Sequence, residues 1–244
     1  MKIENIIAEL KKNEWIDLTH SFGELTPRWP GFNKLSKKII LDFDKYPVRT
    51  HLYTFPGQYG THIDAPAHAS KSGRTLEKID LKECVLSLCV IDCSQKVLEN
   101  PDYALKVEDI DNYENNYGKI PEGSFVAMRS DWYKNWPDQE KFLNVDINGE
   151  PHYPGWDIKA VEFLIKERKI LGIGHETFDT DPPQKKEQYP FKAEVCILKN
   201  DIYQIELMAN LDKIPARGSV IFCIFPKQEG GTGFPVRCFA ICPK

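Results

Sequence analysis

Two histidines and an aspartate lie close together in the stretch GQYGTHIDAPAHAS, residues 57–70. Side chains alternate between faces along an extended segment, so His62 and Asp64 are expected to point the same way. An imidazole nitrogen beside a carboxylate oxygen forms half of a site for Zn, Mn or Fe(II). Pro66 stiffens the next turn, which brings His68 back toward the same place. The spacing therefore predicts metal-assisted chemistry; the alternative is a turn held by hydrogen bonds between Asp64 and His68.

Short apolar segments rich in β-branched and aromatic residues surround this stretch and predict strands. Helical spacing of apolar residues predicts three helices, and Asp157 is placed to cap the last of them. Because strands outnumber helices and do not alternate strictly with them, a mixed, partly antiparallel α/β fold is favoured over a doubly wound parallel sheet. The predicted strands are 15–22, 37–46, 48–55, 84–94, 123–132, 169–176, 218–227 and 236–243, and the predicted helices are 3–10, 105–116 and 157–169.

Composition limits the class of protein. With 41% hydrophobic and 28% charged residues, no repeat and no linker, residues 1–244 are expected to form one globular domain. The net charge of -4 gives no broad attraction to nucleic acid or anionic lipid, and no apolar run approaches the ~20 residues of a membrane span. Seven cysteines, most of them within β-like runs, indicate reduced, buried thiols and a cytoplasmic protein.

The segment from Gln58 to His68 resembles the H-x-G-T-H-x-D-x-P-x-H signature of the cyclase superfamily, which includes kynurenine formamidase and isatin hydrolase. The similarity extends to the opening WIDLTHSF…LTPRWPG, to GHETFDTDP and to a C-terminal block, 204–241. It implies a single-domain cyclase-like fold of the swivelling β/β/α type, with a central mixed, barrel-like sheet flanked by helices. It also implies a homodimer or homotetramer.

The resemblance implies roles for five residues. His62 and Asp64 are expected to bind the metal, and Glu206, in the block E-x-x-x-N-L-D, completes the metal site. His68 is expected to be the general acid/base. Trp29 matches the position at which the formamidases place an aromatic residue over the substrate; packing across a dimer contact is the alternative.

Two positions depart from the family pattern. Gln58 stands where the family has its first metal-ligating histidine, and Glu194 stands where the two-zinc formamidases have another. Both remain candidate ligands through oxygen, and the change from nitrogen to oxygen donors favours one Zn or Mn ion over two. His175, in GHETFD, is a candidate substrate-binding residue, an imidazole that replaces a lost ligand, or a residue that orients a metal ligand without binding the ion. A loop histidine bonded to Glu176 or Asp179 is a further alternative.

The sequence thus predicts a metal-dependent amidohydrolase that cleaves an amide-type C–N bond of a small cyclic or N-acyl (N-formyl) substrate. Two alternatives stay open. One is a catalytically inactive metal- or ligand-binding member of the same fold, because two ligand positions have changed. The other is a lyase or dehydratase, since one Lewis acid and one base also serve elimination.

Overall fold

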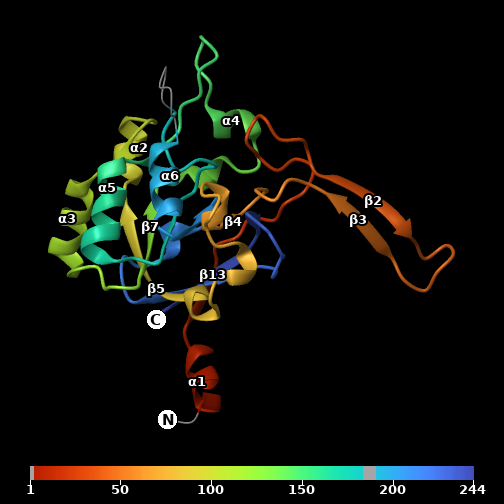
Figure 1. Ribbon diagram of the computed structural model, residues 1–244, viewed down its shortest axis with the longest axis horizontal. Helices are drawn as coiled ribbons and strands as arrows, with labels where there is room; N and C mark the ends of the chain where they lie inside the picture. Colours follow the sequence, from red (N-terminus) through yellow and green to blue (C-terminus); the bar gives the residue numbers. More distant parts are fainter. Residues whose placement is uncertain (1–2, 184–190) are drawn as a thin grey trace.

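A curled nine-stranded sheet, half of a barrel, organises the protein (Figure 1). The structure, a computed structural model, describes residues 3–183 and 191–244. The strand order is β1-β13-β11-β5-β7-β9-β10-β4-β12, in which β5, β7, β9 and β10 run parallel and the remaining pairs are antiparallel. The expected mixed α/β fold is confirmed.

The strands of this sheet are short. They are β1 (Glu14–Asp17), β4 (His62–Asp64), β5 (Val85–Asp92), β7 (Phe125–Arg129), β9 (Gly172–Gly174), β10 (Tyr203–Glu206), β11 (Ser219–Ile224), β12 (Gly233–Pro235) and β13 (Arg237–Cys242). Two small sheets pair β2 (Ser36–Leu41) with β3 (Thr50–Thr54) and β6 (Ala104–Leu105) with β8 (Gly155–Trp156). The α-helices are α1 (Ile3–Leu10), α2 (Ser94–Glu99), α3 (Val107–Tyr117), α4 (Gln139–Leu143), α5 (Ile158–Phe163) and α6 (Lys192–Lys199).

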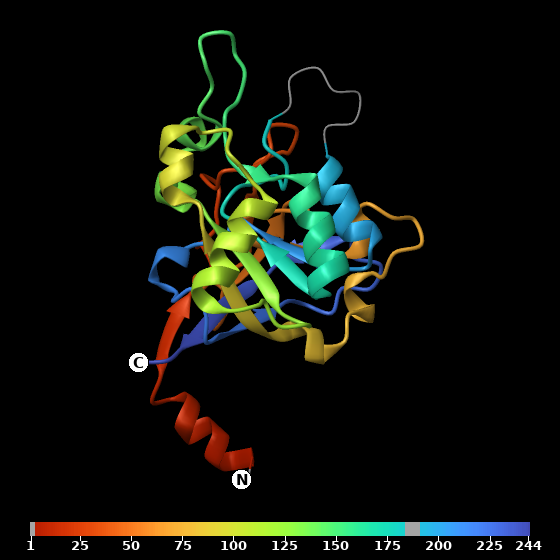
Figure 2. The ribbon, with the colours of Figure 1, turned by 90° about the vertical axis from the view of Figure 1, so that its left-hand side faces the viewer.

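The core has two layers because alternate strand residues face opposite sides. On β5, Cys89 and Ile91 pack against the side on which α2, α3, α5 and α6 lie, whereas Leu88 and Val90 pack inside the curl of the sheet (Figure 2). The helical layer thus closes one face, and the curl buries the other.

Two elements stand away from this body. The hairpin of β2 and β3 extends to one side of the body. Helix α1, which precedes β1, projects from the bottom of the body in the same view (Figure 1). The apolar stripe of α1 is solvent-exposed, because no residue of α1 is buried. Among the described residues, no helix is long and apolar enough to cross a membrane.

Each predicted strand segment contains a strand, and the predicted helices correspond to α1, α3 and α5. Asp157 caps α5 as expected, accepting a hydrogen bond from the Lys159 N–H at 2.8 Å. The helix is only six residues long and continues as a π-helical turn, Leu164–Arg168. Strands β6, β8, β10 and β12 and helices α2, α4 and α6 were not predicted. Buried Gln204 and Glu206 hide the apolar pattern of β10, since the polar groups of the site replace part of its core-facing surface.

Candidate metal-dependent active site

The register between β4 and β10 builds the centre of the site. Glu206 lies opposite His62, and Gln204 lies opposite Asp64. Residues directly opposite each other in an antiparallel pair point to the same face. His62 Nε2 consequently lies 3.6 Å from Asp64 Oδ2 and 3.4 Å from Glu206 Oε2. The predicted grouping of His62, Asp64 and Glu206 is present in the structure.

The backbone before β4 fixes the tautomer of His62. His62 Nδ1 donates to the Gly60 carbonyl at 2.8 Å, which directs Nε2 toward the two carboxylates. Gly60 has φ +63, and a Cβ there would come within 2.9 Å of Phe22 Cβ. Glycine is therefore required where the chain turns to present the imidazole.

The centre holds closely packed charge. Burial opposes protonation of His62, but the carboxylates of Asp64 and Glu206 outweigh it and raise the pKa of His62 to about 9. Burial, together with Asp64, raises the pKa of Glu206 well above its usual value. Burial would also raise the pKa of Asp64, but His62 lowers it to about 2. A positive charge is thus strongly favoured between these side chains.

Gln204 orients both carboxylates. Its Nε2 donates to Asp64 Oδ2 at 3.1 Å and to Glu206 Oε1 at 3.0 Å. Thr180 donates its hydroxyl hydrogen to Gln204 Oε1 at 2.7 Å, which fixes the amide with its N–H groups toward the carboxylates. Gln204 was not predicted from the sequence.

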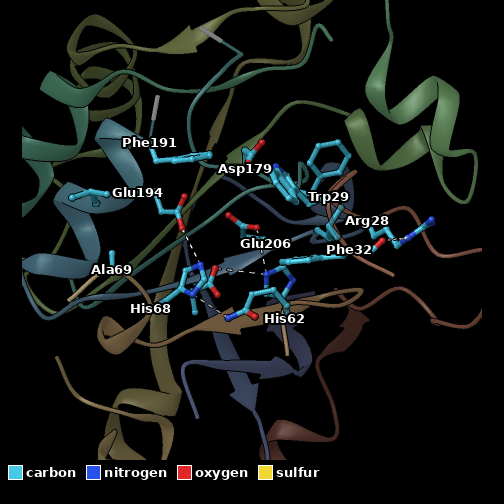
Figure 3. A pocket seen from close by; sticks show the side chains of 15 residues that line it. Arg28, Trp29, Phe32, His62, His68, Ala69, Asp179, Phe191, Glu194 and Glu206 are labelled. Carbon is cyan, nitrogen blue, oxygen red and sulfur yellow. Dashed lines mark hydrogen bonds and ion pairs between the residues drawn. The ribbon is translucent and has the colours of Figure 1, made fainter. Parts of the chain in front are cut away.

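His68 lies on the other side of Asp64, at the end of a 3-10 turn, Pro66–His68. The Gln58 amide Nε2 lies 3.2 Å from His68 Nδ1, and His68 Nε2 lies 3.4 Å from Glu194 Oε1 (Figure 3). Since the Gln58 nitrogen can only donate, His68 accepts at Nδ1 and carries its proton on Nε2. Both residues that depart from the family pattern therefore contact His68.

Helix α6 brings Glu194 to the site. The Asp181 carboxylate accepts hydrogen bonds from the backbone N–H groups of Ala193 and Glu194 and so caps the first turn. Burial, with the added repulsion of Glu206 and Asp64, raises the pKa of Glu194 to about 10. The side chain of Glu194 is thus held near other carboxylates by a cap from another segment.

His175 is buried behind Glu206. Its Nδ1 accepts from the Trp156 indole at 3.3 Å, and its Nε2 lies 3.4 Å from Glu206 Oε1. Burial lowers the pKa of His175 to about 3, so the ring is neutral. His175 is not one of the residues that line the cavity described next. This position supports a role in orienting Glu206 more than a contact with substrate.

A cavity of about 370 Å³ opens above these residues. Trp29, the predicted aromatic cover, lines it and is 41% exposed. Phe32 and Phe191 add further aromatic wall (Figure 3), and Phe178 also lines the cavity. A largely apolar cavity with a few convergent polar groups is typical of a small-molecule site. The full lining is Arg28, Trp29, Phe32, Gln58, His62, Asp64, His68, Ala69, Phe178, Asp179, Phe191, Glu194, Val195, Glu206 and Leu207.

The centre fits a divalent cation. His62 Nε2 and Asp64 Oδ1 are buried, and neither finds a hydrogen-bond partner in the described part of the chain. Donor atoms of His62, Asp64 and Glu206 lie within 4.8 Å of one another. One imidazole and two carboxylates suit Zn or Mn. Asp64, His68 and Glu194 form a second group within the same limit.

Comparison with known proteins identifies the family. Residues 16–182 match the family described as "Putative cyclase". An isatin hydrolase of Roseibium aggregatum is 34% identical over 245 residues, covering 95% of this chain and 92% of the relative. The chain belongs to the cyclase family.

Other relatives of this cyclase-family chain support the same family assignment. A kynurenine formamidase of Bacillus cereus is 27% identical over 236 residues, 93% of this chain and 97% of that protein. The crystal structure of an isatin hydrolase bound to the product analogue thioisatinate is 31% identical and covers all of both chains, with a TM-score of 0.92. Isatin hydrolase A from Labrenzia aggregata, bound to benzyl benzoate, gives a TM-score of 0.91 at 32% identity. The cyclase fold implied by the signature is confirmed, and the chain is a metal-dependent hydrolase of non-peptide amide bonds.

Proposed function

We propose that this cyclase-family chain hydrolyses the C–N bond of a small cyclic amide of the isatin type, using one divalent ion at His62, Asp64 and Glu206. The β4–β10 register carries this proposal, because it places a buried imidazole and two carboxylates under an aromatic cavity. The relatives named isatin hydrolase support a cyclic substrate; those named kynurenine formamidase make an N-formyl aromatic amide the neighbouring possibility.

The ion would be Zn or Mn. When bound, such an ion lowers the pKa of water from 15.7 to about 7 and polarises a carbonyl oxygen. A single ion is favoured because Gln58 and Glu194 contact His68, which leaves His62, Asp64 and Glu206 as the more enclosed group. Gln58 and Glu194 then serve as partners of His68 in place of ligands.

Proton transfer falls to His68, with Glu194 beside it. As general base the ring would be neutral with its proton on Nδ1, and the Gln58 amide would turn its oxygen toward Nδ1 to accept that proton. The free Nε2 would then accept a proton from the attacking water. The same nitrogen then returns a proton to the leaving amide nitrogen as the C–N bond breaks. Gln58 holds the ring in place throughout by its hydrogen bond to Nδ1.

Trp29 would cover the substrate ring, and His175 would hold Glu206 in position. Large planar aromatic side chains suit a flat heterocycle, since ring stacking adds about 0.5–1.5 kcal/mol beyond burial of area.

The chain would act as a homodimer or homotetramer in the cytoplasm. The β2–β3 hairpin exposes large apolar side chains, among them Ile40 at 53% and Phe43 at 62%. A two-stranded hairpin is only marginally stable alone, so burial against a second copy would stabilise it. All seven cysteines are free thiols, and Cys223 and Cys238 share a thiol hydrogen bond of 3.8 Å in place of a disulfide, which fits a reducing compartment.

Elemental analysis of the wild type and His62→Ala, together with isatin turnover in ¹⁸O-labelled water, tests the proposal. We expect about one Zn or Mn per chain, loss of that ion in the variant, and one labelled oxygen in the carboxylate product. Two ions per chain would instead place a metal at Asp64, His68 and Glu194. No metal after adding Mn²⁺ or Zn²⁺ would favour an inactive binding protein, and product without solvent oxygen would favour a lyase.

A further inference from the structure

One carboxylate of the cavity has no part in the chemistry above. Asp179 lies on the wall away from His68, beyond Glu206 and near Trp29 and Phe191 (Figure 3). It is 9% exposed, so almost all of its side chain is shielded from bulk water. A carboxylate at that depth requires hydrogen-bond donors.

One of the two carboxylate oxygens of Asp179 already accepts a hydrogen bond. The Tyr153 hydroxyl donates to Asp179 Oδ2 in a short hydrogen bond, and Thr177 Oγ1 donates to the Asp179 main-chain carbonyl at 2.9 Å, which holds the loop. Across residues 3–183 and 191–244, Oδ1 receives no hydrogen bond, and no lysine or arginine pairs with the carboxylate. Burial, and the repulsion of Asp181 and Asp64, raises the pKa of Asp179 to about 7, as expected for an acceptor short of donors.

The aromatic walls determine which donor can reach Oδ1. Phe178 and Phe191 line the cavity beside Asp179, so the group that meets it is carried on a flat, largely apolar ligand. Asp179 lies beyond Glu206 in the same cavity, so a planar amide whose carbonyl faced His62 and Glu206 would turn an edge toward Asp179 (Figure 3). On a secondary amide this edge can carry an N–H group.

We propose that Asp179 accepts the N–H of the substrate amide and so selects secondary amides, cyclic ones above all, over N-alkylated amides and esters. This specificity role rests on the proposed function and adds a substrate class to it. A site built around a substrate N–H rejects an analogue that lacks it, because its own buried polar group is left without a partner. Roughly a 10- to 100-fold preference follows from one hydrogen bond to a charged acceptor.

Isatin and N-methylisatin provide a matched pair of probes. Their kcat/KM values and, by calorimetry, their dissociation constants are measured for the wild type, Asp179→Asn, Asp179→Ala and Asp181→Asn. In Asp179→Asn the Tyr153 hydroxyl holds the amide oxygen, which turns an NH₂ group toward the ligand. Asp181→Asn is the matched control, because it alters a carboxylate of the same loop that faces α6.

We expect the wild type to prefer isatin at least tenfold, both Asp179 variants to lose that preference, and Asp181→Asn to keep it even where its overall rate falls. An unchanged ratio in the Asp179 variants, no preference in the wild type, or binding of neither compound would overturn the inference. Binding with the expected preference but no hydrolysis would instead reject the proposed function and leave the role of Asp179 supported.

Discussion

At the scale of single residues, negative charge dominates the site. Asp64, Glu194 and Glu206 crowd around two imidazoles, and burial together with repulsion between the carboxylates raises the pKa values of Glu194 and Glu206. A bound cation would relieve the same repulsion that otherwise draws protons into the site.

Metal affinity should therefore rise with pH. A ligand imidazole must be neutral, and the pKa of His62 is raised to about 9 in the free site. Protons compete with the ion below pH 9, so affinity is expected to increase through pH 6, 7 and 8 and to level off above about 9. Chelator competition with Mn²⁺ at each pH measures this, and an affinity independent of pH would contradict it.

Replacing His68 should separate binding from turnover. We expect His68→Ala to keep its metal content and to lose about 10²–10⁴ in kcat, because the proton acceptor is gone while His62, Asp64 and Glu206 remain. Elemental analysis and isatin kinetics provide the two readouts. His51→Ala, on the distant β3 strand, is the control and should behave as wild type. Near-normal kcat in His68→Ala would remove His68 from the mechanism.

Glu176 is a buried carboxyl that should make stability depend on pH. Its Oε2 accepts from the Ser130 N–H and hydroxyl and from the Trp132 N–H, yet burial prevails and raises its pKa from 4.5 to about 7. A raised carboxyl pKa means that the folded state holds the proton more tightly, so stability falls as pH rises from about 4.5 to about 7. At ~1.36 kcal/mol per pH unit the loss is about 3 kcal/mol.

Glu176→Gln should flatten that part of the profile, since the amide carries no charge. Denaturant unfolding at pH 5 and 7.5 for both proteins measures the difference. If the free energy of unfolding changed equally with pH in the wild type and the variant across this range, Glu176 would be ionised at little cost.

At the scale of elements, one cap determines where α6 points. Asp181 reaches from the loop after β9 to the first turn of α6, whose Glu194 enters the site. Losing a side-chain cap costs about 0.5–2 kcal/mol, and here it would also loosen the partner of His68.

We therefore expect Asp181→Ala to lower both thermal stability and kcat. Asp157→Ala is the matched control, because Asp157 caps α5, whose residues do not line the cavity. It should lower stability by a similar amount with kcat unchanged. Thermal unfolding and isatin kinetics on both variants measure the two effects. Equal losses of kcat in both variants would mean that general destabilisation, and not the position of Glu194, lowers kcat.

At the scale of the whole molecule, the exposed apolar hairpin and α1 point to self-association. Phe43→Asp should shift the protein toward monomer, because a charge placed in an apolar contact must be desolvated without a partner. Light scattering after size-exclusion chromatography measures the mass. Leu98→Asp, an exposed leucine on α2, is the control and should leave the mass unchanged. A monomeric wild type would refute the proposed homo-oligomer.

The sequence by itself determined the local half of the site. The spacing of His62 and Asp64 follows from strand periodicity, and the signature around them identifies the family, so the grouping of these two residues with Glu206 could be predicted without coordinates. Most strands were predictable for the same reason, since their apolar alternation is a property of neighbouring residues.

Only the tertiary structure showed which residues surround His62, Asp64 and Glu206. Gln204 meets Asp64 through a register set by pairing across 140 residues, and Asp181 caps a helix that begins eleven residues later. Gln58 and Glu194 carry oxygen donors suited to a metal, yet the side chains of both contact His68, which their residue types alone do not reveal. Such contacts depend on packing between segments that are distant in the sequence. The type of a residue indicates which groups it can bond to, but the fold determines which partner it meets.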